Sequence, residues 1–216
     1  MTLHIDDTPF LPAVTPCDVP EIGEVARERA CARAESTVHS PQSTVQRLPL
    51  ARARKIAETV AERLMPFANR IEIAGSIRRG RETCGDIDLV IETRDREGLI
   101  DRVKQSCTLK TEGQQNTIAI MRDGTQIDLF FARGKTADLF SVSPSNWGTI
   151  LLCRTGSPAH NIYMVEKAKG MGLIWNPYRG VVKGGSLTGE VIASETEEDI
   201  FRALEMEFVR PADREK

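Results

Sequence analysis

Apolar residues recur every three or four positions between residues 50 and 65, which is the spacing of a helix with one buried face. Pro66 ends this run, because proline has no backbone N–H to continue the helix. Residues 71–74 then alternate apolar and polar positions as a strand does, until Gly75-Ser76 interrupts them. A second strand is predicted over 86–92. The pattern therefore predicts a helix packed on a sheet, with a turn between two of its strands.

The second predicted strand begins with two aspartates on one face. Residues two apart in a strand point the same way, so Asp86 and Asp88 lie together. The apolar residues that alternate with them, Ile87, Leu89 and Ile91, face the other way into a core. Two carboxylates a few Å apart repel each other by roughly 3 kcal/mol at an effective dielectric constant of about 20. A divalent cation would relieve this repulsion, so the pair is a candidate metal site.

The turn before this strand has the residues of an anion site. A helix that begins near Ile77 would direct its free backbone N–H groups, the Ser76 hydroxyl and the Arg79 guanidinium toward one point, which suits a phosphate. Gly85 lets the backbone approach such an anion with no side chain in the way. Phosphate donors on one side and paired carboxylates on the other predict a site for a metal-chelated triphosphate.

A third aspartate interrupts the next predicted hairpin. After a short helix over 96–106, two strands at 117–121 and 125–131 flank Asp123-Gly124, a dipeptide typical of a type I′ turn. Asp128 lies among apolar residues of the second of these strands. From the residues alone, it is either an exposed residue of the strand or a third metal ligand.

Beyond residue 135 the pattern predicts a mainly helical part with a few short strands. Ser145 can cap a helix over 146–154. Ser157 can cap the next helix, with Pro158 at its permissive first position. We expect that helix to end near Lys169, because Gly170 and Gly172 follow it. Short strands are predicted over 173–175 and 181–182. A last helix is predicted after Ser194 and Glu197, which have the spacing of a capping box. Helices and strands in this order indicate an α+β fold.

Length and composition restrict the class of protein. At 216 residues the chain can form one compound domain or two small ones. A formal charge of −2 excludes a strongly cationic surface, so any binding of nucleic acid must depend on a local group of basic residues. Five cysteines without a C-x-x-C pair favour reduced thiols over a disulfide or zinc framework. Because no apolar run approaches the length of a membrane span and no signal peptide is visible, we expect a cytoplasmic protein with no membrane partner.

The turn and the two aspartates together resemble a known signature. Gly-Ser, nine residues, then Asp-x-Asp is similar to the nucleotidyltransferase superfamily, and the fuller Gly-Ser-x-Arg-Arg-Gly-x5-Asp-x-Asp resembles the family X DNA polymerases. The resemblance implies a palm, which is a mixed β-sheet with helices on one face, followed by a small α/β C-terminal subdomain. Residues 1–46 hold five prolines and more acidic than basic residues, which indicates a mostly disordered leader. The resemblance divides the rest of the chain into a catalytic palm over 47–134 and a nucleotide- and base-pair-binding subdomain over 135–216.

The resemblance also implies roles for individual residues. Asp86, Asp88 and Asp128 would be catalytic and would hold two Mg²⁺ ions, with Mn²⁺ as an alternative. The expected nucleotide-binding residues are Gly75, Ser76, Arg79, Gly85, Gly156, Ser157, Asn161 and Asn176. For Asn161, an ordinary place on an exposed helix face stays open. The implied partners are a dNTP and a DNA primer on a template or across a gap, bound by a monomer.

The sequence departs from the family pattern at several positions. Cys153-Arg154 stands where an aromatic pair usually crowds the sugar, and Pro177 replaces an acid thought to steady the closed form. Some relatives carry a lyase before the palm that uses a lysine, but the first lysine here is Lys55. We therefore expect no lyase activity.

Two other functions compete with DNA synthesis. A nucleotidyltransferase that modifies RNA, a protein or a small molecule would share Gly-Ser and Asp-x-Asp, although it would not need the motif from Thr155 to Asn161. A catalytically silent nucleic-acid or nucleotide-binding module is the second alternative. Three retained carboxylates argue against it, because clustered acids that hold nothing only destabilise a fold.

Overall fold

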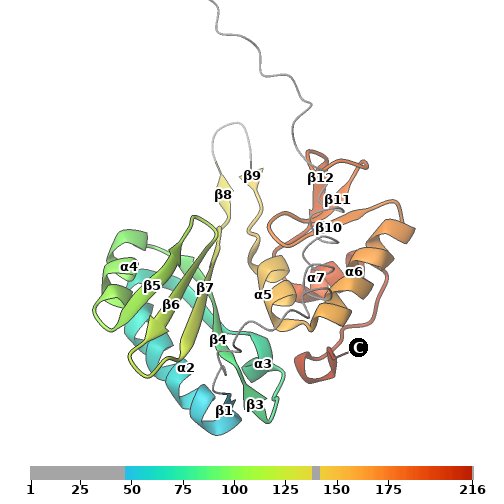
Figure 1. Ribbon diagram of the computed structural model, residues 1–216. Coiled ribbons are helices and arrows are strands. Elements are labelled where there is room, and N and C mark those ends of the chain that lie inside the picture. The colour runs from blue at the N-terminus through green and yellow to red at the C-terminus, as the bar shows by residue number, and fades with distance from the viewer. Residues whose placement is uncertain (1–46, 138–141, 216) are drawn as a thin grey trace, which may run out of the picture. The chain divides into compact units, whose positions relative to one another are not determined.

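A five-stranded mixed sheet forms the centre of the first half of the protein (Figure 1). The structure is a computed structural model that describes residues 47–137 and 142–215, so the predicted leader over 1–46 lies outside the described residues. The strands run in the order β2-β4-β7-β6-β5. Their bounds are β2 (Ala68–Ile73), β4 (Asp86–Thr93), β5 (Cys107–Glu112), β6 (Asn116–Met121) and β7 (Gln126–Ala132).

The pairing of β4 with β7 decides which residues meet across the sheet. These two strands are parallel, whereas β2 with β4, β6 with β7 and β5 with β6 are antiparallel. In the parallel register Asp88 lies opposite Asp128, and Asp86 lies opposite Gln126. Because side chains alternate along each strand, residues in register point to the same face. The sheet therefore brings the two aspartate-bearing segments together on one side.

Two helices cover the opposite face of the sheet, α2 (Leu50–Leu64) and α4 (Arg96–Lys104). The core beneath them includes Ile87 and Leu89 from β4 and Ile127 and Leu129 from β7, all of which are buried. These are the residues that alternate with the aspartates, as the strand pattern predicted. The predicted α+β fold with a mixed sheet is confirmed, and the two helices of the first half lie on one face of that sheet.

The hairpin between β6 and β7 differs from the prediction. A type I′ turn needs positive φ at both central residues, but only Gly124 has it, at +84°, among the residues of this loop. The Gly124 N–H donates to the Met121 carbonyl, and the Thr125 N–H donates to Asp123 Oδ1. Asp123 thus keeps negative φ and uses its side chain to hold the turn. The prediction of a type I′ turn was wrong.

The second half of the protein, residues 142–215 of the described chain, contains three α-helices and a three-stranded antiparallel sheet. The helices are α5 (Trp147–Thr155), α6 (Pro158–Gly170) and α7 (Glu197–Ala203), and the strands are β10 (Ile174–Asn176), β11 (Gly180–Lys183) and β12 (Glu190–Ala193). The short elements are β1 (Leu48–Pro49), η1 (Met65–Phe67), α3 (Gly75–Arg78), β3 (Thr83–Cys84), β8 (Thr136–Ala137), β9 (Val142–Ser143) and η2 (Pro211–Asp213). Ser157 caps α6 as predicted, accepting from the His160 N–H at 3.1 Å.

The start of α7 corrects a second prediction. Thr196, not Ser194, caps the helix by accepting from the Asp199 N–H at 3.1 Å. Ser194 instead donates to the Ser145 carbonyl at 2.7 Å. The Glu197 carboxylate does not complete a capping box, because two arginines bind it. The predicted capping box was wrong because tertiary contacts hold both of its side chains.

The described residues belong to one compact unit. Within it, α5 packs on the face of the sheet that carries the aspartates, where Trp147, Ile150 and Leu151 contact Val90 and Phe130 in a second apolar cluster. The predicted boundary between 134 and 135 stays a prediction. No helix in the described ranges has the length and apolar character needed to cross a membrane.

Candidate active site

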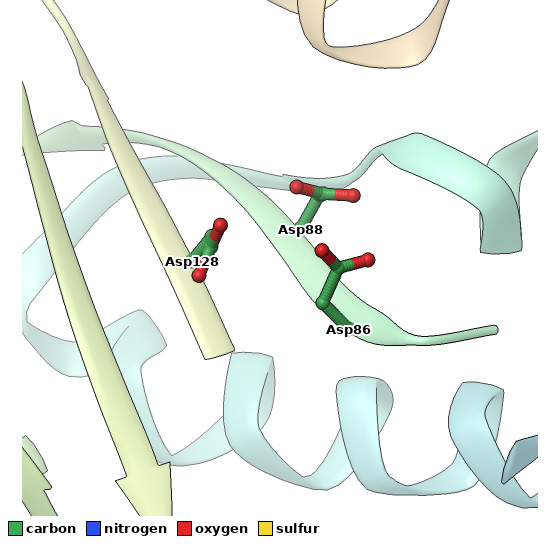
Figure 2. Close-up of side chains that lie close together, drawn as sticks. All are labelled: Asp86, Asp88 and Asp128. Atoms are coloured by element: carbon green, nitrogen blue, oxygen red, sulfur yellow. The ribbon is translucent and has the colours of Figure 1, made fainter. Parts of the chain in front are cut away.

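Three carboxylates converge where β4 and β7 lie side by side. Asp86 and Asp88 come from β4 and Asp128 from β7, and each offers an oxygen within 4.8 Å of the others. Figure 2 shows all three side chains on the same side of the two strands, with the carboxylates of Asp86 and Asp88 next to each other. The parallel register explains this meeting, since Asp88 and Asp128 are directly opposed. Of the two placements that the sequence left open for Asp128, the structure has the one beside the pair.

Burial and mutual repulsion change the acidity of this cluster. Burial, followed by the charges of Asp86 and Asp128, raises the pKa of Asp88 from 3.8 to about 8. Burial also raises the pKa of Asp128, although a 2.8 Å hydrogen bond from the Gln126 amide works in the opposite direction. Burial penalises an ionised carboxylate and the neighbouring carboxylates add repulsion, so a bound cation would stabilise the ionised forms. The cluster therefore has the electrostatics of a cation site.

Gly75 allows Asp88 to reach this position. Its φ is +59°, and a Cβ added there would lie 1.8 Å from Asp88 Oδ2. Both the backbone conformation and the space therefore require glycine. The Ala74 N–H donates to the Asp88 carbonyl at 2.9 Å, which fixes the loop to β4. The glycine of the Gly-Ser pair thus positions a carboxylate of the cluster as well as forming the turn.

Ser76 has the environment expected of a ligand-binding hydroxyl. Its Oγ is buried and has no hydrogen-bond partner among the described residues. A buried hydroxyl without a partner is costly, so a ligand or water is expected there. The predicted helix after this residue exists as α3, but it begins at Gly75, two residues before the predicted start, and is only four residues long.

Arg79 makes contacts that the sequence did not predict. Its Nε donates to Glu215 Oε1 at 2.7 Å, and one terminal nitrogen donates to the Thr155 carbonyl at 2.6 Å. The predicted phosphate arginine is therefore held by the end of α5 and by the C-terminal stretch. Gly85 lies between β3 and β4, directly before Asp86.

The four predicted nucleotide-binding residues of the second half have local hydrogen bonds. Gly156 ends α5, and Ser157 caps α6. The Asn161 amide nitrogen donates to the Cys153 carbonyl at 2.9 Å, while its oxygen is buried without a partner in the described structure. The Asn176 oxygen accepts from the backbone of the two residues after Pro177 at 2.9 and 3.1 Å. Their roles toward a nucleotide stay predictions.

Arg154 links this group to the carboxylates. Its guanidinium lies 4.1 Å from the centre of the Phe130 ring and donates to the Tyr178 hydroxyl at 2.9 Å. Phe130 follows Asp128 by two residues on the same face of β7. The positive charge of Arg154 works against the raised pKa of both Asp88 and Asp128. The sequence marked this residue only as a departure from the family pattern.

Gln126 was missed, although the sequence contained a signal for it. It precedes Asp128 by two residues, so the alternation of a strand places both on one face, where the amide reaches the carboxylate. The same rule had identified the pair of Asp86 and Asp88. Glu197 and Arg214 were missed for a different reason, since no spacing in the sequence relates them to the Gly-Ser turn.

The donor set suits a hard divalent cation. Carboxylate oxygens are the ligands that Mg²⁺ and similar ions prefer, and this is the one such cluster of three found in the described ranges. The raised pKa of Asp88 and the unpartnered Ser76 hydroxyl both fit a site that takes a cation with an anionic ligand. The residues present therefore fit a metal ion at this position.

Two protein families match separate parts of the chain. Residues 47–123 match the family described as the DNA polymerase beta palm, and residues 150–215 match the family described as the DNA polymerase beta thumb. Asp86 and Asp88 lie in the first match. Asp128 lies between the two matches, so only the geometry of the sheet relates it to the other aspartates.

Two individual DNA polymerases are also similar to this chain in sequence. The chain is 28% identical over 195 residues to DNA polymerase lambda of Rattus norvegicus, covering 79% of this chain and 33% of the relative. It is 29% identical over 172 residues to the DNA polymerase/3'-5' exonuclease PolX of Bacillus subtilis (strain 168), covering 79% of this chain and 29% of the relative. The chain thus spans about a third or less of the length of these curated relatives.

A solved structure of polymerase beta from Leishmania infantum, described as a ternary P/T complex, has a similar fold. The TM-score is 0.65 and the sequence identity is 16%, with 92% of this chain and 89% of that chain covered. At this identity the likeness concerns the fold alone.

Proposed function

Because this chain belongs to family X of the DNA polymerases, we propose that it transfers a nucleotide from a dNTP to the 3′-hydroxyl of a DNA primer and releases pyrophosphate. The observation that carries the proposal is the cluster of Asp86, Asp88 and Asp128, together with the unpartnered hydroxyl of Ser76, which follows the glycine that Asp88 approaches. Carboxylates that gather cations next to a group that can bind a phosphate are what nucleotidyl transfer requires. The known relatives are longer proteins, so the activity of this chain is a proposal.

The three aspartates would hold two Mg²⁺ ions, with Asp86 and Asp88 contributing to both and Asp128 to one. Bound Mg²⁺ supplies positive charge that lowers the pKa of a coordinated hydroxyl and offsets the charge of the phosphates. Gln126 keeps the Asp128 carboxylate oriented by binding one of its oxygens. Gly75 leaves room for the Asp88 carboxylate at this position because it has no side chain.

The proposed reaction forms a P–O bond to the primer and an O–H bond to the proton acceptor, and it breaks one O–H bond and one P–O bond. The primer oxygen attacks the α-phosphorus of the dNTP as its O–H bond breaks, and the bond from the α-phosphorus to the bridging oxygen breaks on the opposite side. The proton goes to the free oxygen of Asp128, if a side chain accepts it, and pyrophosphate leaves with the electrons of the broken bond. The protein contributes placement and charge and forms no covalent intermediate.

The nucleotide would be bound by residues from both halves of the protein. Ser76 and Arg79 would contact the triphosphate, with the backbone at Gly75 and Gly85 close to it. From the second half, the motif over 156–161 and Asn176 would lie near the sugar and base. Asn161 has a buried side-chain oxygen with no partner in the described structure, which leaves a group free to bind a ligand.

We further propose that the DNA substrate is a short gap or a primer end. The formal charge of −2 provides no broad cationic surface, so weak and distributive binding is expected. We place the protein in the cytoplasm as a monomer, in keeping with the free cysteines at positions 84, 107 and 153.

A primer-extension gel tests the proposal. A labelled primer, alone and annealed across a one-nucleotide gap, is incubated with each dNTP and each rNTP in Mg²⁺ and in Mn²⁺. We expect addition of the nucleotide that matches the template. Addition to the bare primer would indicate a terminal transferase, and no addition to either would contradict the proposal.

A pair of variants connects the activity to the cluster. Asp128→Asn keeps the shape of the side chain and removes its charge, and should lower the rate by about a hundredfold or more. Asp101→Asn, at an exposed position in α4, removes the same charge away from the sheet face and should leave the rate unchanged. Near-native extension by Asp128→Asn would show that the site is assigned wrongly.

A further inference from the structure

The carboxylate of Glu215 lies on the arginine that the proposed function assigns to the triphosphate. Glu215 Oε1 accepts from Arg79 Nε at 2.7 Å, and Oε2 lies 3.6 Å from a terminal nitrogen of Arg81. A carboxylate and a phosphate offer a guanidinium the same type of acceptor, two oxygens in one plane. Glu215 therefore occupies a position on Arg79 that a phosphate could take.

The preceding residue fixes this contact in the fold. Arg214 is fully buried, and one terminal nitrogen pairs with Glu197 Oε1 at 2.6 Å. Its Nε donates to the Val209 carbonyl at 2.9 Å, and its own carbonyl accepts from the Ser157 N–H at 3.1 Å. The residue directly before Glu215 is thus anchored through both its side chain and its backbone carbonyl. The pair with Arg79 is a built feature of this part of the protein.

The remaining contacts of Arg79 show which edge of the guanidinium Glu215 occupies. One terminal nitrogen is used by the Thr155 carbonyl, at 2.6 Å. Glu215 takes Nε, which together with the other terminal nitrogen forms the edge that binds an oxyanion in a bidentate manner. Removing Glu215 would free this edge, while the contact with Thr155 would still orient the side chain.

We propose that Glu215 is an internal competitor of the incoming triphosphate, a positioning residue that holds Arg79 until phosphate oxygens replace it. This inference rests on the proposed function. Like charges repel, so a carboxylate left beside the triphosphate would weaken its binding. The nucleotide must therefore displace Glu215 from Arg79.

Arg81 gives the displaced carboxylate a second partner. Its side chain is 55% exposed, compared with 14% for Arg79, and it already lies on the far oxygen of Glu215. A small rotation of Glu215 would replace the contact with Arg79 by a closer one with Arg81. Arg81 thereby lowers the free-energy cost of moving the Glu215 carboxylate away from Arg79.

The binding of Mg²⁺-tripolyphosphate, measured by titration calorimetry on the full chain, tests the proposal without DNA. Glu215→Gln keeps the shape and removes the charge, so it should bind tripolyphosphate about fivefold more tightly than the wild type. Glu207→Gln removes an exposed charge from the same C-terminal stretch and should bind as the wild type does. A purely structural role for Glu215 predicts weaker binding, so unchanged or weaker binding by Glu215→Gln overturns the proposal.

The role of Arg81 is tested in two backgrounds. Arg81→Ala should weaken tripolyphosphate binding about threefold when Glu215 is present, because the carboxylate loses its second partner. In the Glu215→Gln background the same change should have no effect. Equal weakening in both backgrounds would mean that Arg81 binds the phosphate itself, which overturns the exchange.

The two proposals can fail separately. If the wild type extends primers and binds tripolyphosphate but Glu215→Gln does not bind it more tightly, only the competitor role is wrong. If the wild type neither extends primers nor binds tripolyphosphate, the proposed function fails, and the competitor role with it.

Discussion

Arg78 and Glu197 are 119 residues apart in the sequence, and they form a bidentate ion pair with N–O distances of 2.7 and 2.8 Å. Arg78 lies in α3, directly before Arg79, and Glu197 is the first residue of α7. The fully buried Arg214 binds the same carboxylate at 2.6 Å. One glutamate therefore connects the loop of the candidate phosphate site to the second half of the protein.

Loss of this glutamate should strongly destabilise the protein. Glu197→Ala leaves two guanidinium groups without their partner, one of them fully buried, which should cost about 3–5 kcal/mol of the free energy of unfolding. Urea denaturation measures this loss. Glu198→Ala, at the exposed next position of the same helix, should change stability by less than about 0.5 kcal/mol. Equal and small losses for both variants would show that the buried network contributes little.

The pH dependence of this contribution has a definite sign. Burial alone would raise the pKa of Glu197, but hydrogen bonds from Arg78 and Arg214 outweigh it and leave the pKa below its ordinary value of 4.5. A folded-state pKa below the unfolded one means that the unfolded protein binds the proton more readily. The stabilisation is therefore complete above pH 4.5 and is lost as the pH falls through the lower folded value.

The sequence predicted those features that depend on residues close together in the chain. Alternation in β4 placed Asp86 and Asp88 on one face, and the apolar residues between them in the core. Partners far apart in the chain could not be found this way. Nothing near Arg79 indicates Glu215, because a charged residue has no periodic signature and its partner is chosen by the packing of the two halves.

Local signals failed where a tertiary contact replaced them. Ser194 and Glu197 have the spacing of a capping box, but Ser145 and the two arginines hold their side chains in other directions. Asp123-Gly124 has the composition of a type I′ turn, but the Asp123 side chain stabilises a different backbone. In both cases the sequence located the end of the element to within about two residues and misjudged the contact that forms it.

Binding of Mg²⁺ should release a proton near neutral pH. The pKa of Asp88 is about 8 without metal, so its carboxyl is largely protonated at pH 7 and must ionise to bind the cation. Calorimetry at pH 7 in two buffers with different ionisation enthalpies should report the release of about one proton per protein, and much less at pH 9. Asp88→Asn should abolish the difference between buffers. Identical heats for the wild type in both buffers at pH 7 would contradict the raised pKa.

The same pKa shift makes the metal-free protein less stable in base. The folded state binds the Asp88 proton more tightly than the unfolded state does, so the free energy of unfolding falls as the pH rises from 3.8 to about 8. Thermal melts with a chelator should show this decline. Addition of Mg²⁺ should reverse it most strongly at the alkaline end, where the Asp88 carboxyl is ionised. A decline that is unchanged in Asp88→Asn would have to come from another group.

Gln126 should control the ionisation of Asp128. Burial raises the pKa of Asp128, and the hydrogen bond from the Gln126 amide opposes this rise. Gln126→Leu removes the opposing contact, so the pKa should rise further and the acidic limb of the pH–rate profile for primer extension should move to higher pH. The loss of one hydrogen bond to a charged group corresponds to a rate about tenfold or more lower on the acidic limb of the profile. Gln114→Leu, at an exposed position, should leave the profile unchanged.

Two glycines with the same backbone strain separate the conformational role of Gly75 from its spatial one. Gly75 and Gly80 both have positive φ, +59° and +73°, so an alanine at either should cost roughly 1–2 kcal/mol of stability. Only at Gly75 would the new Cβ meet a side chain, because Asp88 Oδ2 lies 1.8 Å from its ideal position, whereas nothing lies within 4 Å at Gly80.

Gly75→Ala should therefore also push the Asp88 carboxylate out of the cluster. We expect its Mg²⁺ affinity to fall by at least about tenfold, and that of Gly80→Ala to stay unchanged, as measured by calorimetry. If both variants keep the affinity of the wild type, the close approach of Asp88 to the glycine does not set the geometry of the metal site.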